Sequence, residues 1–147
     1  MKIKLLLLIL LNAIVQPALA GPFTDKLSVC LVKNTSESDK DLLVKWIYAA
    51  MSSHPKVKSM SNITIKQGNA LNKKTAALFV TLLTKRCHSE TKSALEYEGT
   101  NAFKTSFGIL GEVAMQGLIK APSVNQYISG LNNYLDTKAL NKKLGIK

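Results

Sequence analysis

The sequence contains few of the residues that build catalytic and metal sites. Its 147 residues include two cysteines, two histidines and nine acidic residues. None of its serines lies in a G-x-S-x-G motif, and no Asp–His pair is recognisable by spacing. The cysteines and the histidines, His54 and His88, do not match the ligand spacing of a zinc site. The sequence therefore predicts no catalytic residue, no bound cofactor and no metal.

Long apolar runs are also scarce, and the one that occurs lies at the start of the chain. Residues 5–15 are apolar apart from Asn12, and two lysines precede them. Pro17 follows, and Ala18-Leu19-Ala20 has the small-x-small pattern of a cleavage site. A membrane span is the competing interpretation, but a span needs roughly 20 apolar residues. We therefore expect residues 1–20 to be a Sec signal peptide that is cleaved after Ala20.

The expected mature chain, residues 21–147, has the length of one domain, and we place it in the periplasm or outside the cell. The whole sequence carries a net charge of +11, and Arg86 is the only arginine among its 20 basic residues. In an exported chain without an arginine cluster, this charge favours acidic proteins or anionic lipid headgroups over nucleic acid. We expect a protein partner, weak contact with an anionic membrane surface, and no nucleic acid.

The two cysteines, Cys30 and Cys87, are an even pair in a chain expected to be exported, which is typical of a disulfide. Their spacing excludes a C-x-x-C redox pair. A bond between them would close a loop of 57 residues. In the chain-entropy estimate, closing such a loop stabilises a fold by roughly 4 kcal/mol. Two free thiols are the alternative. A Cys30–Cys87 bond would hold a short first helix beside the end of a longer one.

Helical periodicity covers most of the mature chain, because apolar residues recur at three- and four-residue steps. Ser38, Thr64 and Ser89 are the expected N-caps, and Gln67 completes a capping box with Thr64. His54-Pro55, Gly99 and Ala121-Pro122 are the expected helix ends. No segment shows a convincing strand pattern. The prediction is an all-α, single-domain orthogonal bundle of five or six helices with one disulfide.

Aromatic residues and glycines indicate how these helices pack. The aromatics that fall on apolar helix stripes, and that we expect in the core, are Trp46, Phe79, Phe103, Phe107, Tyr127 and Tyr134. The last stripe, from Val124 to Leu135, is expected to be a core face as well. Gly108, Gly111 and Gly117 lie inside one predicted helix, where each costs about 1 kcal/mol relative to alanine. We therefore expect another helix to approach that helix closely.

The remaining candidates for chemistry are weak. Glu96, Glu98 and Glu112 are acids that a fold can bring together for acid–base work, although the helical wheel of the helix expected over residues 101–120 places Glu112 on a solvated side. Cys87 and His88 are formally a nucleophile and a base, but neighbouring residues on a helix point in different directions. The histidines, His54 and His88, lie at predicted helix C-termini, where a partly charged imidazole suits the helix dipole.

The composition therefore favours a small exported protein without enzymatic activity. The leading hypothesis is a periplasmic protein-binding module of the inhibitor, immunity or chaperone type. One alternative is a basic protein that binds the envelope or a membrane surface. A second alternative is a hydrolase whose carboxylates converge only in the fold, which requires Glu96, Glu98 or Glu112 to lie in a cleft.

Overall fold

The computed structural model describes residues 21–146, and the expected signal peptide, residues 1–20, lies outside them. The described residues form seven α-helices and no strand. The helices are α2 (Pro22–Lys33), α3 (Glu37–Ser52), α4 (Ile65–Thr81), α5 (His88–Glu98), α6 (Asn101–Lys120), α7 (Pro122–Ser129) and α8 (Thr137–Leu144). Three shorter turns of helix join them: η1 (Lys58–Met60), the π-helical η2 (Leu82–Arg86) and η3 (Gly130–Tyr134). The expected all-α bundle is confirmed, and α8 is the additional helix.

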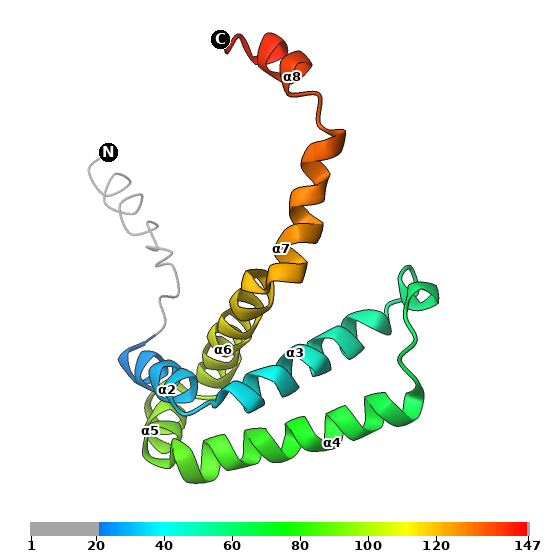
Figure 1. The fold of residues 1–147 in the computed structure, drawn as a ribbon. Helices are drawn as coiled ribbons and strands as arrows, with labels where there is room; N and C mark the ends of the chain where they lie inside the picture. Colours follow the sequence, from blue (N-terminus) through cyan, green and yellow to red (C-terminus); the bar gives the residue numbers. More distant parts are fainter. Residues whose placement is uncertain (1–20, 147) are drawn as a thin grey trace, which may run out of the picture.

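Three parts of the fold are distinct in Figure 1. Helices α2, α5 and α6 pack against one another and form the body. Helices α3 and α4 run side by side away from it as a hairpin, which contacts the body through α6 and η2. Helices α7 and α8 extend from the far end of α6 in another direction, so that a wide angle separates them from the hairpin (Figure 1).

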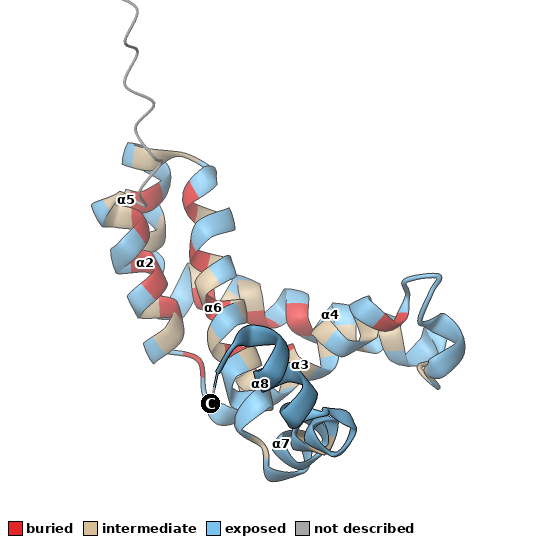
Figure 2. Cartoon of the chain, turned by 90° about the horizontal axis from the view of Figure 1, so that it is seen from above, coloured by how far each residue is buried: buried red, intermediate tan, exposed pale blue. Residues whose placement is uncertain are grey.

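The core lies between α2, α5 and α6 and continues to the base of the hairpin; the buried residues in Figure 2 lie mainly along α2 and α6. Its buried apolar members are Leu27, Leu31, Leu43, Leu78, Leu82, Cys87, Ala94, Ala102, Leu110 and Ala114. Ser106 also lies there, fully buried on α6, and its hydroxyl donates to the Thr24 carbonyl at 3.2 Å. The Ser28 hydroxyl donates to the same carbonyl at 2.8 Å and lies 3.1 Å from the Ser106 oxygen. These bonds satisfy the buried hydroxyls and fix α2 against α6.

Of the three expected N-cap residues, one caps its helix and two do not. Thr64 and Gln67 form the expected capping box at the start of α4. The expected cap Ser38 is wrong, because Ser36 accepts from the Asp39 amide and Asp39 accepts from the Ser36 amide in return. Ser89 is not a cap either, since α5 already begins at His88 and has no side-chain cap. Several polar residues in sequence can cap a helix, and the path of the preceding loop selects one.

The predicted disulfide is confirmed. Cys30 on α2 is bonded to Cys87, which is fully buried at the end of the π-helical turn η2, with 5.9 Å between the two Cα atoms. The Cys87 amide donates to the Leu82 carbonyl at 2.8 Å, five residues back, which is the π-helical pattern. As expected, the bond holds the first helix beside the end of the long helical segment. His88 lies at the start of α5, so the expected position at a helix C-terminus is wrong for this residue.

The expected role of the α6 glycines is wrong. A Cβ atom added at Gly108, Gly111 or Gly117 would meet no atom within 4 Å, so no described helix approaches α6 closely there. The glycines instead leave space, and Gly108 and Gly111 line an apolar slot between α3 and α6. The penalty for glycine in a helix is therefore not offset by packing within the described residues.

Candidate interaction surface

The last predicted core stripe is not in the core. No residue of α7, η3 or α8 is buried. Tyr127 is 85% exposed and Tyr134 is 87% exposed, so the expectation of a core position is wrong for both. Periodicity correctly indicates an amphipathic helix, but it does not indicate which element, if any, covers the apolar face. We call residues 122–146 the C-terminal arm.

The arm exposes large apolar side chains along its whole length. Its exposed large apolar residues are Tyr127, Ile128, Leu131, Tyr134, Leu135, Leu140, Leu144 and Ile146. Val124, Tyr127, Ile128 and Leu131 follow the i, i+3, i+4, i+7 spacing, which places them on one face of α7 and its continuation. Contiguous exposed apolar surface bordered by polar groups marks interaction sites in soluble proteins.

Helix α8 adds charge to the arm. It starts at Asp136, whose side chain accepts from the Ala139 amide at 2.9 Å, and it ends at Gly145, which has a φ of 67°. At 100° per residue, Leu140 and Leu144 share one side of this helix. Its three lysines, Lys138, Lys142 and Lys143, lie on the remaining sides and are exposed. Asp136 is the only acid of the arm, so the arm presents apolar groups beside net positive charge.

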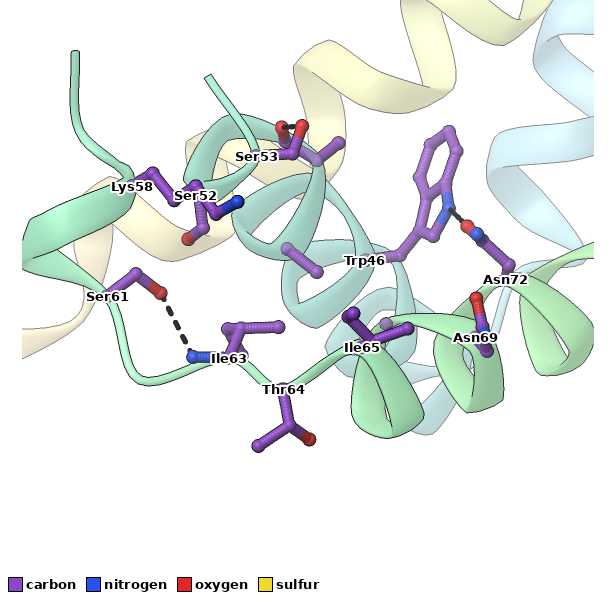
Figure 3. A pocket seen from close by; sticks show the side chains of 13 residues that line it. Trp46, Ser52, Ser53, Lys58, Ser61, Ile63, Thr64, Ile65, Asn69 and Asn72 are labelled. Atoms are coloured by element: carbon purple, nitrogen blue, oxygen red, sulfur yellow. Dashed lines mark hydrogen bonds between the residues drawn. The ribbon is translucent and has the colours of Figure 1, made fainter. Parts of the chain in front are cut away.

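A pocket of about 530 Å³ lies at the outer end of the hairpin, between the last turns of α3 and the first turns of α4 (Figure 3). At its inner end the indole nitrogen of Trp46 donates to the side-chain oxygen of Asn72 at 2.8 Å. At its loop side the Ile63 amide donates to the Ser61 hydroxyl at 3.2 Å. Lys58 is the one charged residue of its lining. With no carboxylate or histidine in that lining, the pocket offers no acid–base pair.

The apolar slot at the base of the hairpin is smaller, at about 290 Å³. Its lining residues are Leu43, Trp46, Ile47, Phe79, Phe107, Gly108, Leu110 and Gly111. Phe79 packs tilted on Phe107 and edge-on to Trp46, with ring centroids 4.6 and 5.9 Å apart. The expected core position is confirmed in part: Phe79, Phe103 and Phe107 are partly buried and pack against the core, whereas Trp46 is partly buried and packs edge-on to Phe79.

The three candidate carboxylates do different things. Glu96 and Glu112 are exposed on α5 and α6, and Glu112 is solvated as the helical wheel predicts. Glu98 instead caps α2: its carboxylate accepts from the Phe23 and Thr24 amides at 2.9 and 2.8 Å and from the Thr24 hydroxyl. Desolvation would raise the pKa of Glu98, but these hydrogen bonds outweigh it and hold the pKa below its ordinary value of 4.5. None of the three lines a pocket described above, and nothing in the described residues supports the hydrolase alternative.

The single arginine is part of the fold rather than an open anion site. The Arg86 guanidinium donates to the Asn34 carbonyl at 2.7 Å and to the Asp39 carboxylate at 2.6 Å. Desolvation would raise the pKa of Asp39, but the bonds from Arg86 and Ser36 lower it below 3.8. Arg86 therefore links η2 to the first turn of α3, next to the disulfide.

Comparison of the chain with protein-family models, with curated proteins and with solved structures gives no match. Within residues 21–146, no three His, Cys, Asp or Glu side chains are grouped as metal ligands. No described helix combines the length and apolar character needed to cross a membrane. The function is therefore inferred from the arm and the pockets themselves. The exposure of Tyr127 and Tyr134 was not predicted from the sequence, because helical periodicity marks an apolar face without showing what covers it.

Proposed function

We propose that this chain is an exported, non-enzymatic protein-binding module of the inhibitor, immunity or chaperone type, and that the C-terminal arm is its docking surface. One observation carries the proposal: eight large apolar side chains of the arm are exposed, and none of its residues is buried. Exposed tyrosines supply large contact area at low entropic cost, which suits a binding hot spot. Large exposed apolar patches are rare on soluble monomers and mark interaction sites, which favours a partner that covers these side chains.

Charge indicates the chemistry of the partner. The arm carries Lys138, Lys142 and Lys143 against the single acid Asp136, and the whole sequence has a net charge of +11. An interface with complementary potential would place acidic side chains around an apolar patch on the partner. We therefore expect an acidic protein whose apolar patch covers the Tyr127 face of the arm.

Site-specific photo-crosslinking tests the docking surface. A photoreactive residue at position 127 should label one protein of the same compartment in a saturable manner, and unlabelled protein should compete for it. The same residue at position 96, exposed on α5, should not do so and serves as the matched control. Leu131→Ala should weaken binding about tenfold or more, with little change in thermal stability because Leu131 is exposed. Equal, unsaturable labelling at both positions would contradict the proposal.

A second candidate function has its own observation, the amphipathic and basic character of α8. Leucines on one side and lysines on the others are the pattern of a helix that lies on a membrane surface. In this reading Leu140 and Leu144 enter the headgroup region and the lysines contact anionic lipid. The helix has only eight residues, so the binding we expect is weak and depends on salt.

Vesicle sedimentation tests this second candidate. The protein should bind vesicles that contain anionic phospholipid at low salt and should leave them at about 0.5 M salt, where charges are screened within a few Å. Replacing Lys138, Lys142 and Lys143 with glutamine should reduce binding about tenfold or more. A control variant with the same loss of charge at Lys56, Lys58 and Lys66, in and beside the hairpin loop, should retain most of it. Equal losses in the two variants would reject a specific role for α8.

A further inference from the structure

Glu98 lies against the beginning of the described chain. Its carboxylate is the acceptor for the first two backbone donors of α2, the amides of Phe23 and Thr24, and these residues precede it by 75 and 74 positions. Pro22 at the first position of the helix has no N–H group. The nitrogen of Gly21 is therefore the remaining backbone nitrogen at this helix end that a carboxylate can approach.

Gly21 and Glu98 are in close contact. A Cβ atom built on Gly21 would lie 2.2 Å from Oε1 and 2.3 Å from Cδ of Glu98, so the carboxylate occupies the space that any larger residue would need. Because the nitrogen and the Cβ of one residue lie about 2.5 Å apart, the Gly21 nitrogen is at most about 4.7 Å from Oε1. A charge on that nitrogen would therefore lie no more than about 4.7 Å from the carboxylate oxygen.

No basic side chain in the described residues neutralises Glu98. The two ion pairs found within residues 21–146 join Lys40 to Glu37 and Arg86 to Asp39. Glu98 is instead held by amide and hydroxyl donors alone, next to the stacked rings of Phe23 and Tyr97, whose centroids are 4.6 Å apart. The site thus has a fixed carboxylate, a glycine that leaves room beside it, and no cation from a side chain.

We propose that Glu98 is the binding site for the α-ammonium group of Gly21, which forms when the leader is cleaved after Ala20. In that step water hydrolyses the Ala20–Gly21 amide bond, the leader keeps the new carboxylate, and the Gly21 amine takes up a proton at neutral pH. The proposal rests on the export proposed above but not on the arm. In this proposal the carboxylate of Glu98 has its ammonium partner only after the leader has been removed.

Such an ion pair has a physical purpose at this position. A positive charge at the N-terminus of a helix is unfavourable because the helix dipole is positive there. The Glu98 carboxylate accepts from the Phe23 and Thr24 amides at the helix N-terminus and lies beside Gly21, so it would interact favourably with both the dipole and the new charge. Processing would then tighten the contact between α2 and α5 rather than weaken it.

Two chains that differ only at the N-terminus test the proposal. One begins at Gly21, and the other carries two serines before it, so that its Gly21 nitrogen is an uncharged amide. At pH 7 the first chain should unfold at a temperature about 3 °C higher. The difference should vanish in the Glu98→Gln background. It should also vanish at about pH 11, because an ion pair that raises the α-amino pKa stabilises below that pKa and is lost as the pH rises through it.

A direct titration keeps the proposal falsifiable if Glu98→Gln folds poorly. The Gly21 amino group, followed by NMR in the unsubstituted chain, should titrate above the usual α-amino pKa of about 8. Titration at or below that value, or equal melting temperatures for the two chains, would overturn the proposal. The exported protein should begin at Gly21 by intact mass, and a different N-terminus would also overturn it. Neither result would affect the crosslinking test of the arm.

Discussion

Replacing Cys30 and Cys87 with alanine should lower the melting temperature by about 15 °C. The disulfide closes a loop of 57 residues, for which the chain-entropy estimate is about 4 kcal/mol. That value is comparable to the whole net stability of a small domain. Thermal unfolding followed by circular dichroism at 222 nm measures the change. At 37 °C the variant should have a measurable unfolded fraction.

Reduction provides the matched control for this prediction. A reductant strong enough to open the disulfide should lower the melting temperature of the unsubstituted protein by a similar amount and leave the double-alanine variant unchanged. Arg86 should limit the local disorder, because its bonds to Asn34 and Asp39 hold the same region without the disulfide. An unchanged melting temperature after complete reduction, verified by thiol titration, would refute the stabilising role.

Leu31→Ala should destabilise the fold by about 3 kcal/mol, or roughly 10 °C in melting temperature. Leu31 is fully buried in the core between α2 and its neighbours. The substitution removes apolar contacts and leaves a cavity, because close-packed surroundings relax only in part. Chemical unfolding with urea gives the free energy of unfolding. An unchanged dependence of that free energy on urea concentration (the m-value) would show that both proteins unfold in two states.

Leu131→Ala is the same chemical change on an exposed residue and is the control for it. Leu131 is 61% exposed in η3, so its truncation should change stability by less than about 0.5 kcal/mol. The ranking of the two variants should therefore differ between the stability assay and the binding assay. Leu31→Ala lowers stability most, and Leu131→Ala lowers partner binding most. A strong loss of stability in Leu131→Ala would mean that the arm packs on the body.

Several features could be derived from sequence because they depend on near neighbours. The Thr64–Gln67 capping box needs only four consecutive residues, and the helical periodicity of α3 or α6 needs only a few turns. The disulfide was also predictable, since two cysteines allow one intramolecular pairing.

Other features were beyond sequence because they depend on which segments meet. The same apolar spacing that buries one face of α2 leaves Tyr127 and Tyr134 in solvent, since nothing in the described fold lies against the arm. The α6 glycines predicted a close helix and instead border open space. Glu98 was one of three equivalent acids in sequence, and only the meeting of α2 and α5 made it a cap.

The sequence by itself determined that the chain is helical, basic and closed by one Cys30–Cys87 bond, because caps, periodicity and a single cysteine pair are local or combinatorial constraints. Only the tertiary structure decided which apolar faces are covered, which carboxylate is engaged, and that the last amphipathic segment stands apart from the body. A side chain is buried only when a second element covers it, and a stretch of sequence specifies its own apolar face but not the element that covers that face.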